Sequence, residues 1–173
     1  MAERAIGLIS RKRTASAPVF SRSPNKRWLV YERRSFPCII DTENDTEELV
    51  GWEQSQFMER PNFGPMDTLW HPRIEMLAVS VGIGRHESAI WIWRPGKPLL
   101  KLDKSDFDPL LGGEIAPMGL DHCYGKSWKG RDLLVDYTYE ISKNEEYEPW
   151  TARFQWSPET GRLRLLRKAP STP

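Results

Sequence analysis

Four aspartates near the middle of the chain are the residues best suited to chemistry. Asp103, Asp106 and Asp108 lie within one short stretch, and Asp121 follows them. Carboxylates of this kind can act as general acids and bases in hydrolysis. They define a hydrolase hypothesis, which a bell-shaped pH dependence would support if it disappeared when one of them was replaced.

The adjacent residues His122 and Cys123, with Asp121 before them, have the types of a nucleophile and its base. In a strand, neighbouring side chains point to opposite faces and cannot form a catalytic dyad. Gly119 and Gly125 flank the pair and favour a loop instead. We therefore expect an ordinary loop or half-buried position here, and no catalytic role.

Metal and cofactor sites have no clear signature. His71, His86 and His122 lack the spacing of a metal-binding motif. The acidic stretch at residues 41–48 places oxygens at alternate positions, but Thr46 stands where a calcium loop needs glycine. A glycine-rich nucleotide-binding loop is also missing. The sequence predicts no metal ion and no cofactor.

The chain of 173 residues has the length of one domain, residues 1–173, with its own core. Its formal net charge is +1, but residues 1–34 carry +7, residues 35–160 carry −10 and the remaining residues carry +4. An acidic body between basic ends favours partners of opposite charge.

Two further features concern the cellular setting. Cys38 and Cys123 are too few and too far apart for a disulfide framework or a zinc site. The chain has no apolar run long enough to predict a transmembrane helix. We expect a cytoplasmic protein with a basic start over residues 1–17 that can be flexible.

A strand–turn–strand unit recurs along the chain and predicts the fold. Pro24, Pro72 and Pro158 each follow a serine or histidine and precede a leucine by five positions. Proline and the polar residues after it favour a tight turn, and the apolar residues behind it favour strands. Residues 88–93 are apolar on both faces, which predicts a strand covered on both sides. Only residues 46–58 have a plausible helical pattern, so we expect an all-β chain of antiparallel sheets with little helix.

The phrases SPNKRWLVY and WHPRIEMLAVSVG resemble the turn-and-strand signature of TolB-like and WD40-like β-propeller repeats. WKGRDLLVDY resembles a variant that has lost the proline. The aspartate of the signature is replaced in each copy. The resemblance implies about three blade-like repeats, at residues 18–66, 67–114 and 115–168. A closed propeller needs more blades, so a partial propeller or a β-sandwich is expected.

These features lead to a non-catalytic protein-binding domain as the first hypothesis. Its sharpest form is an immunity protein that neutralises a cognate bacterial toxin by covering the active site of the toxin. Modest size, missing catalytic motifs and the acidic body suit this role. A hydrolase with loop carboxylates and a scaffold or assembly subunit with exposed edge strands are the alternatives. We expect a protein partner with a basic surface, and neither a membrane, a nucleic acid nor a small-molecule substrate.

The expected contact residues are clustered carboxylates and tryptophans beside charged or turn residues. Clustered carboxylates speed association with a basic partner, and aromatic residues are enriched at interfaces. The set comprises Asp41, Glu43, Asp45, Glu47, Glu48, Trp52, Trp128, Glu145, Glu146, Glu148 and Trp150. Trp28, Trp91, Trp93 and Trp156 fall within strand patterns and are expected in the core.

Overall fold

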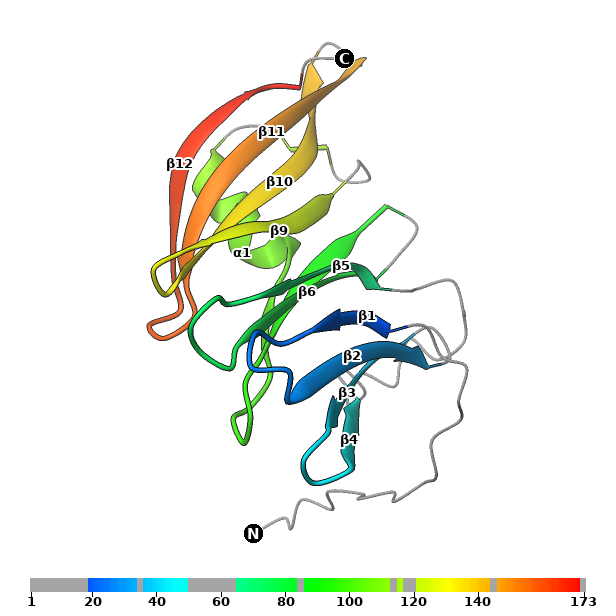
Figure 1. Ribbon diagram of the computed structural model, residues 1–173. Coiled ribbons are helices and arrows are strands. Elements are labelled where there is room, and N and C mark those ends of the chain that lie inside the picture. The colour runs from blue at the N-terminus through cyan, green and yellow to red at the C-terminus, as the bar shows by residue number, and fades with distance from the viewer. Residues whose placement is uncertain are drawn as a thin grey trace, which may run out of the picture.

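The computed structural model describes residues 19–33, 36–49, 65–83, 86–112, 115–116, 121–143 and 146–171. Over these residues the chain forms three four-stranded antiparallel sheets and one short helix (Figure 1). The prediction of an all-β fold with little helix is therefore confirmed. No helix of the described residues is long and apolar enough to cross a membrane.

The strands of each sheet follow one another along the chain, so each sheet is a meander. The first sheet contains β1 (Val19–Arg22), β2 (Trp28–Arg33), β3 (Phe36–Asp41) and β4 (Thr46–Leu49). The central sheet contains β5 (Pro65–Trp70), β6 (Leu77–Gly82), β7 (Ser88–Trp93) and β8 (Leu100–Leu102). The C-terminal sheet contains β9 (His122–Lys129), β10 (Asp132–Lys143), β11 (Glu146–Ser157) and β12 (Arg162–Pro170). The helix α1 (Lys104–Leu111) lies between β8 and β9 along the chain.

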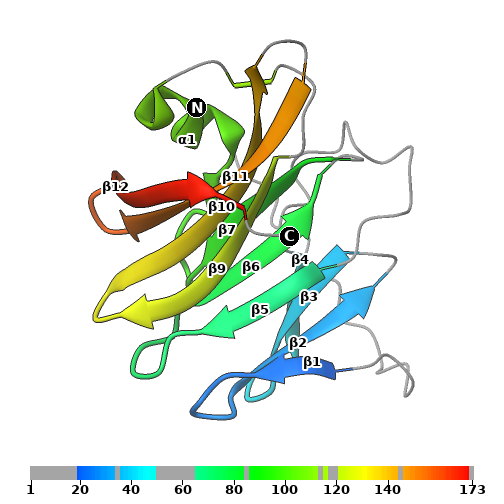
Figure 2. The ribbon, with the colours of Figure 1, turned by 90° about the horizontal axis from the view of Figure 1, so that it is seen from above.

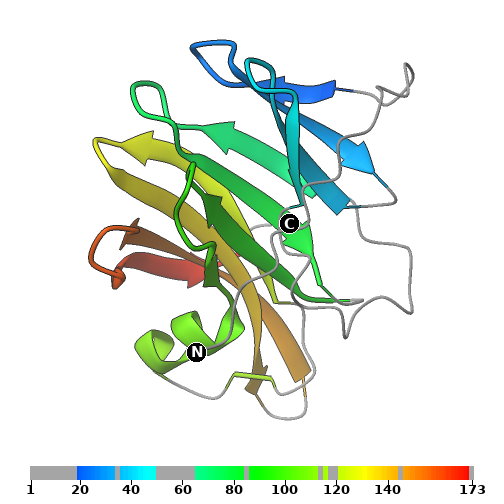
Figure 3. The same cartoon turned by 90° about the horizontal axis from the view of Figure 1, so that it is seen from below.

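The central sheet is covered on both faces, as its alternating sequence predicts. Along β7, Trp91 and Trp93 pack into a core shared with the first sheet, while Ile90 and Ile92 pack into a core shared with the C-terminal sheet. Figures 2 and 3 show the resulting stack, with the first sheet in blue at one end and the C-terminal sheet in yellow to red at the other. The four tryptophans predicted to lie in the core are all buried.

The sheets do not form a propeller, because the two outer sheets stay at opposite ends of the stack (Figure 1). The face of the C-terminal sheet that points away from the core carries polar pairs instead of a seam for another blade. Arg153 donates two hydrogen bonds to Asp136, at 2.6 and 2.8 Å, and Gln155 donates one to Asp132. Polar side chains paired in this way are stable when they face water, so no further sheet packs on this face of the C-terminal sheet among the described residues.

In the first two copies of the repeated turn, the side chain of the residue before the proline organises the turn. In the first copy the Ser23 hydroxyl accepts a hydrogen bond from the backbone N–H of Trp28 at 2.9 Å. In the second copy His71 Nδ1 accepts from two backbone N–H groups, both at 3.1 Å. Nε2 therefore carries the ring proton and donates to the carbonyl oxygen of Gly130 at 2.7 Å. The buried His71 thus ties the central sheet to the C-terminal sheet.

The helix prediction for residues 46–58 is wrong where it can be compared. Residues 46–49 form β4, which pairs with β3 through Cys38↔Leu49 and three further pairs. The rest of that segment lies outside the described residues. Pairing with β3 satisfies the backbone N–H and C=O groups of residues 46–49. The apolar pattern of the segment is too weak to favour a helix instead.

Candidate functional site

The helix α1 begins where its sequence provides a cap. The Asp103 carboxylate accepts a hydrogen bond from the backbone N–H of Ser105 at 3.0 Å. The Asp106 carboxylate accepts from the backbone N–H of Asp103 at 2.9 Å, which completes a capping box. Phe107 anchors the helix, because its ring stacks on that of Tyr137 at 4.6 Å and is fully buried.

A cluster of four polar side chains, the Asp121 cluster, joins α1 to β10 and to the residue that precedes β9. It comprises Asp121, Lys104, Asp108 and Tyr137. Lys104 Nζ donates to Asp121 Oδ2 at 2.5 Å and lies 4.0 Å from Asp108. The Tyr137 hydroxyl lies 2.9 Å from Asp121 Oδ1 and 3.0 Å from Asp108 Oδ1. Asp121 is 2% exposed, so its charge depends on these partners.

The hydroxyl of Tyr137 has a single proton for two carboxylates. Burial raises the pKa of Tyr137, and the negative charge of Asp121 raises it further, so the phenol keeps that proton. Burial also raises the pKa of Asp108, against a smaller opposite effect of the bond from Tyr137. The hydroxyl can donate that proton to Asp121 or to Asp108, and Lys104 supplies a positive charge beside both carboxylates. The cluster therefore ties the helix to the sheet.

The other two candidate aspartates do not join this cluster. Asp103 forms an ion pair with Lys101, whose Nζ lies at 2.6 Å. Asp106 accepts the hydrogen bond from Asp103 that completes the helix cap. The pKa of Asp103 is lowered, because hydrogen bonds from Lys101 and Ser105 outweigh the opposing effect of burial. Of the four aspartates in the hydrolase hypothesis, the structure brings together Asp108 and Asp121 alone, and Tyr137 lies between them.

His122 and Cys123 are in a strand, β9, so the loop expected here is wrong, while His122 is half-buried, as the alternative expected. Cys123 is fully buried, and burial raises the pKa of its thiol to about 12. The Ser88 hydroxyl accepts from the backbone N–H of Cys123 at 2.7 Å, so this residue is part of the sheet contact. Burial lowers the pKa of His122 despite the nearby Asp121. The described residues contain no cluster of histidine, cysteine and acidic side chains that could hold a metal.

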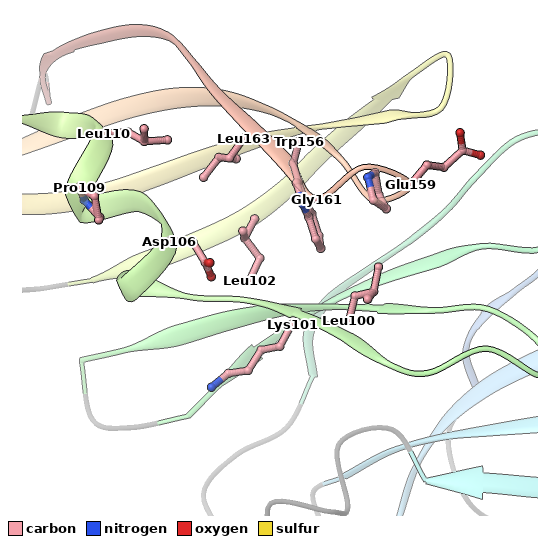
Figure 4. Close-up of a pocket in the computed structure, with 11 residues that line it drawn as sticks. Leu100, Lys101, Leu102, Asp106, Pro109, Leu110, Trp156, Glu159, Gly161 and Leu163 are labelled. Carbon is pink, nitrogen blue, oxygen red and sulfur yellow. The ribbon is translucent and has the colours of Figure 1, made fainter.

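A groove opens on the other side of α1, between β8 and the hairpin of β11 and β12 (Figure 4). Its volume is about 560 Å³. Leu100, Leu110, Trp156 and Leu163 give it an apolar lining. The ionisable residues among those that line it are Lys101, Asp106 and Glu159. This groove was not predicted, because its walls come from three separate segments.

The acidic turn between β3 and β4 is only partly available to a partner. Asp41 is buried and accepts two hydrogen bonds from Arg27, at 3.0 and 2.7 Å, which lower its pKa well below the usual range. Glu43 is mostly exposed and lies 3.3 Å from Arg27, while Asp45 is exposed at the turn itself. Glu47 is half-buried. Asp41 is thus a structural residue, and Glu43 and Asp45 are the exposed carboxylates.

The remaining predicted contact residues lie elsewhere. Trp128 Nε1 donates to the carbonyl oxygen of Leu69 at 3.1 Å, and Trp150 packs against the core. Glu146 is exposed and Glu148 half-buried, at the end of β11 that lies far from the acidic turn of the first sheet (Figure 1). The structure therefore places the two groups of predicted carboxylates at opposite ends of the molecule (Figure 1). Trp52, Glu145 and the side chain of Glu48 lie outside the described residues.

No protein-family model matches the chain, and a search of curated proteins gives no significant match.

Proposed function

We propose that this chain is a protein-binding domain without a catalytic role. The observation that supports this is the lining of the groove beside α1, which consists mainly of leucine, proline and tryptophan side chains. Among the described residues, the lining contains no serine, threonine, histidine or cysteine that could serve as a nucleophile or a base. Leucine, proline and tryptophan side chains that line a groove together with charged residues are typical of a protein interface.

Three of the four carboxylates of the hydrolase alternative also support a non-catalytic protein, and the fourth, Asp106, serves the helix cap and lines the groove. Asp108 and Asp121 are bound to each other through Tyr137, and Asp103 is bound to Lys101. A general acid or base must face the substrate, whereas each of these carboxylates faces a partner side chain within the protein. Their arrangement supports a structural role for them and a binding role for the protein.

The sharper form of the proposal is an immunity protein that covers the active site of a bacterial toxin with a basic surface. Its support is the pair of exposed carboxylates Glu43 and Asp45, which lie in the turn between β3 and β4. Exposed carboxylates speed the approach of a basic protein through long-range attraction.

The test begins with a tagged chain purified gently from its native cell. A basic protein recovered in stoichiometric amount and toxic when expressed alone is expected. Its association with the purified chain is then measured at low and high salt. We expect the double variant Glu43→Lys/Asp45→Lys to associate about tenfold more slowly at low salt, and the difference to shrink at high salt.

The control is Glu146→Lys/Glu148→Lys, which changes the net charge equally at the opposite end of the molecule. It should slow association much less, because screening confines the effect to nearby charges. Equal rates for the wild type and the Glu43/Asp45 variant would refute the electrostatic form. The binding proposal itself fails if no stoichiometric protein partner is recovered.

A further inference from the structure

We propose that the outer face of β12 binds an extended acidic segment of another protein, in which aspartate or glutamate stands at every second position. The inference goes beyond the proposed function, because it concerns the end of the molecule opposite the turn of Glu43 and Asp45 and a partner of opposite charge (Figure 1). Two observations carry it: three arginines in a row that have no ion pair among the described residues, and the place of that row on the last strand of its sheet.

Three arginine side chains of β12 point to the same face of the C-terminal sheet. Along β11, Arg153 and Gln155 alternate with the buried Phe154 and Trp156, so they point away from the core. Residues that pair across neighbouring strands lie on the same face of a sheet. The partners on β12 of Arg153, Gln155 and the next outward residue of β11 are therefore outward too. They form the arginine row, and all three are exposed: Arg162, Arg164 and Arg167.

The arginine row has no counter-charge in the described part of the chain. The ion pairs closest to it in the sequence join Arg153 to Asp136 and Arg131 to Glu159, and they include no member of the row. Arg164 donates to the neutral side chain of Gln155 at 2.9 Å. Residues 161–173 contain no aspartate or glutamate. Carboxylates of a partner can therefore pair with the row, and a guanidinium can bind a carboxylate through two parallel hydrogen bonds.

The spacing of the row matches that of an extended polypeptide. Arg162 and Arg164 are two residues apart, which is about 6.6 Å along a strand. Side chains on one face of any extended chain recur at the same interval. Between Arg164 and Arg167 the pairing with β11 shifts at a bulge, which leaves Arg167 opposite the outward Arg153. Acidic residues at alternate positions of an extended partner can therefore meet successive arginines of the row.

The place of the row favours a polypeptide over a nucleic acid. β12 is the last strand of its sheet and pairs only with β11 among the described residues. A polypeptide along β12 can pair with its backbone, and the side chains opposite the arginines then point to the same face as they do. A nucleic acid forms no such ladder, and β12 has no aromatic side chain on which a base could stack. Asp132 and Asp136, which bond to outward residues of β11, would repel a polyanion that extended across the sheet.

The experiment is an NMR titration of the isotope-labelled full-length chain with a synthetic octapeptide in which threonine and glutamate alternate. An isomer with its glutamates contiguous tests the spacing, and a single-stranded thymidine octamer tests nucleic acid. The row variant is Arg162→Gln/Arg164→Gln/Arg167→Gln. The matched control is Arg22→Gln/Arg73→Gln/Lys97→Gln, which removes three exposed positive charges outside the C-terminal sheet. Circular dichroism and the unfolding midpoint establish that both variants fold like the wild type.

We expect the alternating peptide to bind the wild type and to shift the backbone amide resonances of β11 and β12 most. Its dissociation constant should rise about tenfold or more for the row variant, because the charge-assisted contacts are lost. For the control variant it should change by less than about twofold, because screening confines the effect of a charge to its surroundings. The isomer and the thymidine octamer should each bind the wild type about fivefold more weakly than the alternating peptide.

Four results would overturn the inference: no binding of the alternating peptide, equal binding to the wild type and the row variant, equal binding of the two isomers, or a thymidine octamer that binds as tightly as the peptide. The last result would assign the row to nucleic acid. Failure here is separable from failure of the proposed function, because the row variant leaves Glu43 and Asp45 unchanged and their test uses a basic partner at the other end of the molecule.

Discussion

Two lysine–aspartate ion pairs near α1 allow the effect of burial to be measured directly. Lys104 Nζ lies 2.5 Å from Asp121, and Lys101 Nζ lies 2.6 Å from Asp103. The two lysine side chains are equally accessible, at 31% and 30% exposed. The carboxylates differ, because the side chain of Asp121 is 3% exposed and that of Asp103 is 22% exposed.

Replacing each lysine by methionine removes the charge and keeps the length of the side chain. Removing one member of a buried pair costs about 3–5 kcal/mol, because a charge is left buried without compensation. We expect Lys104→Met to lower the free energy of unfolding by about 3 kcal/mol, at the lower end of that range. Tyr137 still donates to Asp121 in the variant, which is the reason for choosing the lower end. For Lys101→Met we expect less than about 1 kcal/mol, as for exposed pairs.

The assay is urea unfolding at pH 7 and 25 °C, followed by tryptophan fluorescence and by circular dichroism. Adding Asp121→Asn to the Lys104→Met variant should recover part of the loss, because a neutral amide needs no counter-charge. The reasoning is refuted if the two single variants differ by less than about 1 kcal/mol, since burial would then not decide the cost.

Three further predictions test other parts of the fold. Asp41→Asn should lower the free energy of unfolding at pH 7, because the bonds from Arg27 hold the pKa of Asp41 below its unfolded value. That stabilisation is present above about pH 4 and is lost as the pH falls. Urea unfolding at pH 7, 5 and 3 should therefore show the difference in stability between the wild type and the variant shrinking at low pH. The Cys123 thiol, with its pKa raised to about 12 by burial, should resist a thiol reagent at pH 8 in the native protein and react in urea; labelling of the native residue, located by mass spectrometry, would contradict its burial. His71→Ala should cost about 2–3 kcal/mol in thermal or urea unfolding, because two turn N–H groups and the carbonyl of Gly130 lose their partner, whereas the exposed His86→Ala should change stability by less than about 0.5 kcal/mol.

Much of the secondary structure could be predicted from local patterns. The proline turns, with Ser23 and His71 before them, and the doubly apolar β7 all have their cause within a few residues, so they could be seen in the sequence. The helix α1 was missed, although Asp103 and Asp106 form a capping box three residues apart. An eight-residue helix with Pro109 inside it has too few turns to show an apolar period.

The candidate sites depended on the stacking of the sheets. Sequence could nominate Asp108 and Asp121, but Tyr137 and Lys104 join them only because α1 packs against the C-terminal sheet, where Phe107 contacts Tyr137 and Phe154. Asp41 looked like a surface carboxylate, and strand pairing placed it beside Arg27 in a buried position. The acidic residues of the β3–β4 hairpin and of β11 lie at opposite ends of the molecule, because their strands belong to the two outer sheets.

The sequence by itself determined the all-β class, the positions of the repeated turns and which strand would be covered on both faces. These follow from φ preferences and from the two-residue period of a strand, which act over a few residues. Only the tertiary structure decided that the sheets stack without closing, that a groove opens beside α1 and which charges are paired. These depend on side chains far apart in the chain, whose meeting is fixed by how apolar faces are buried against one another.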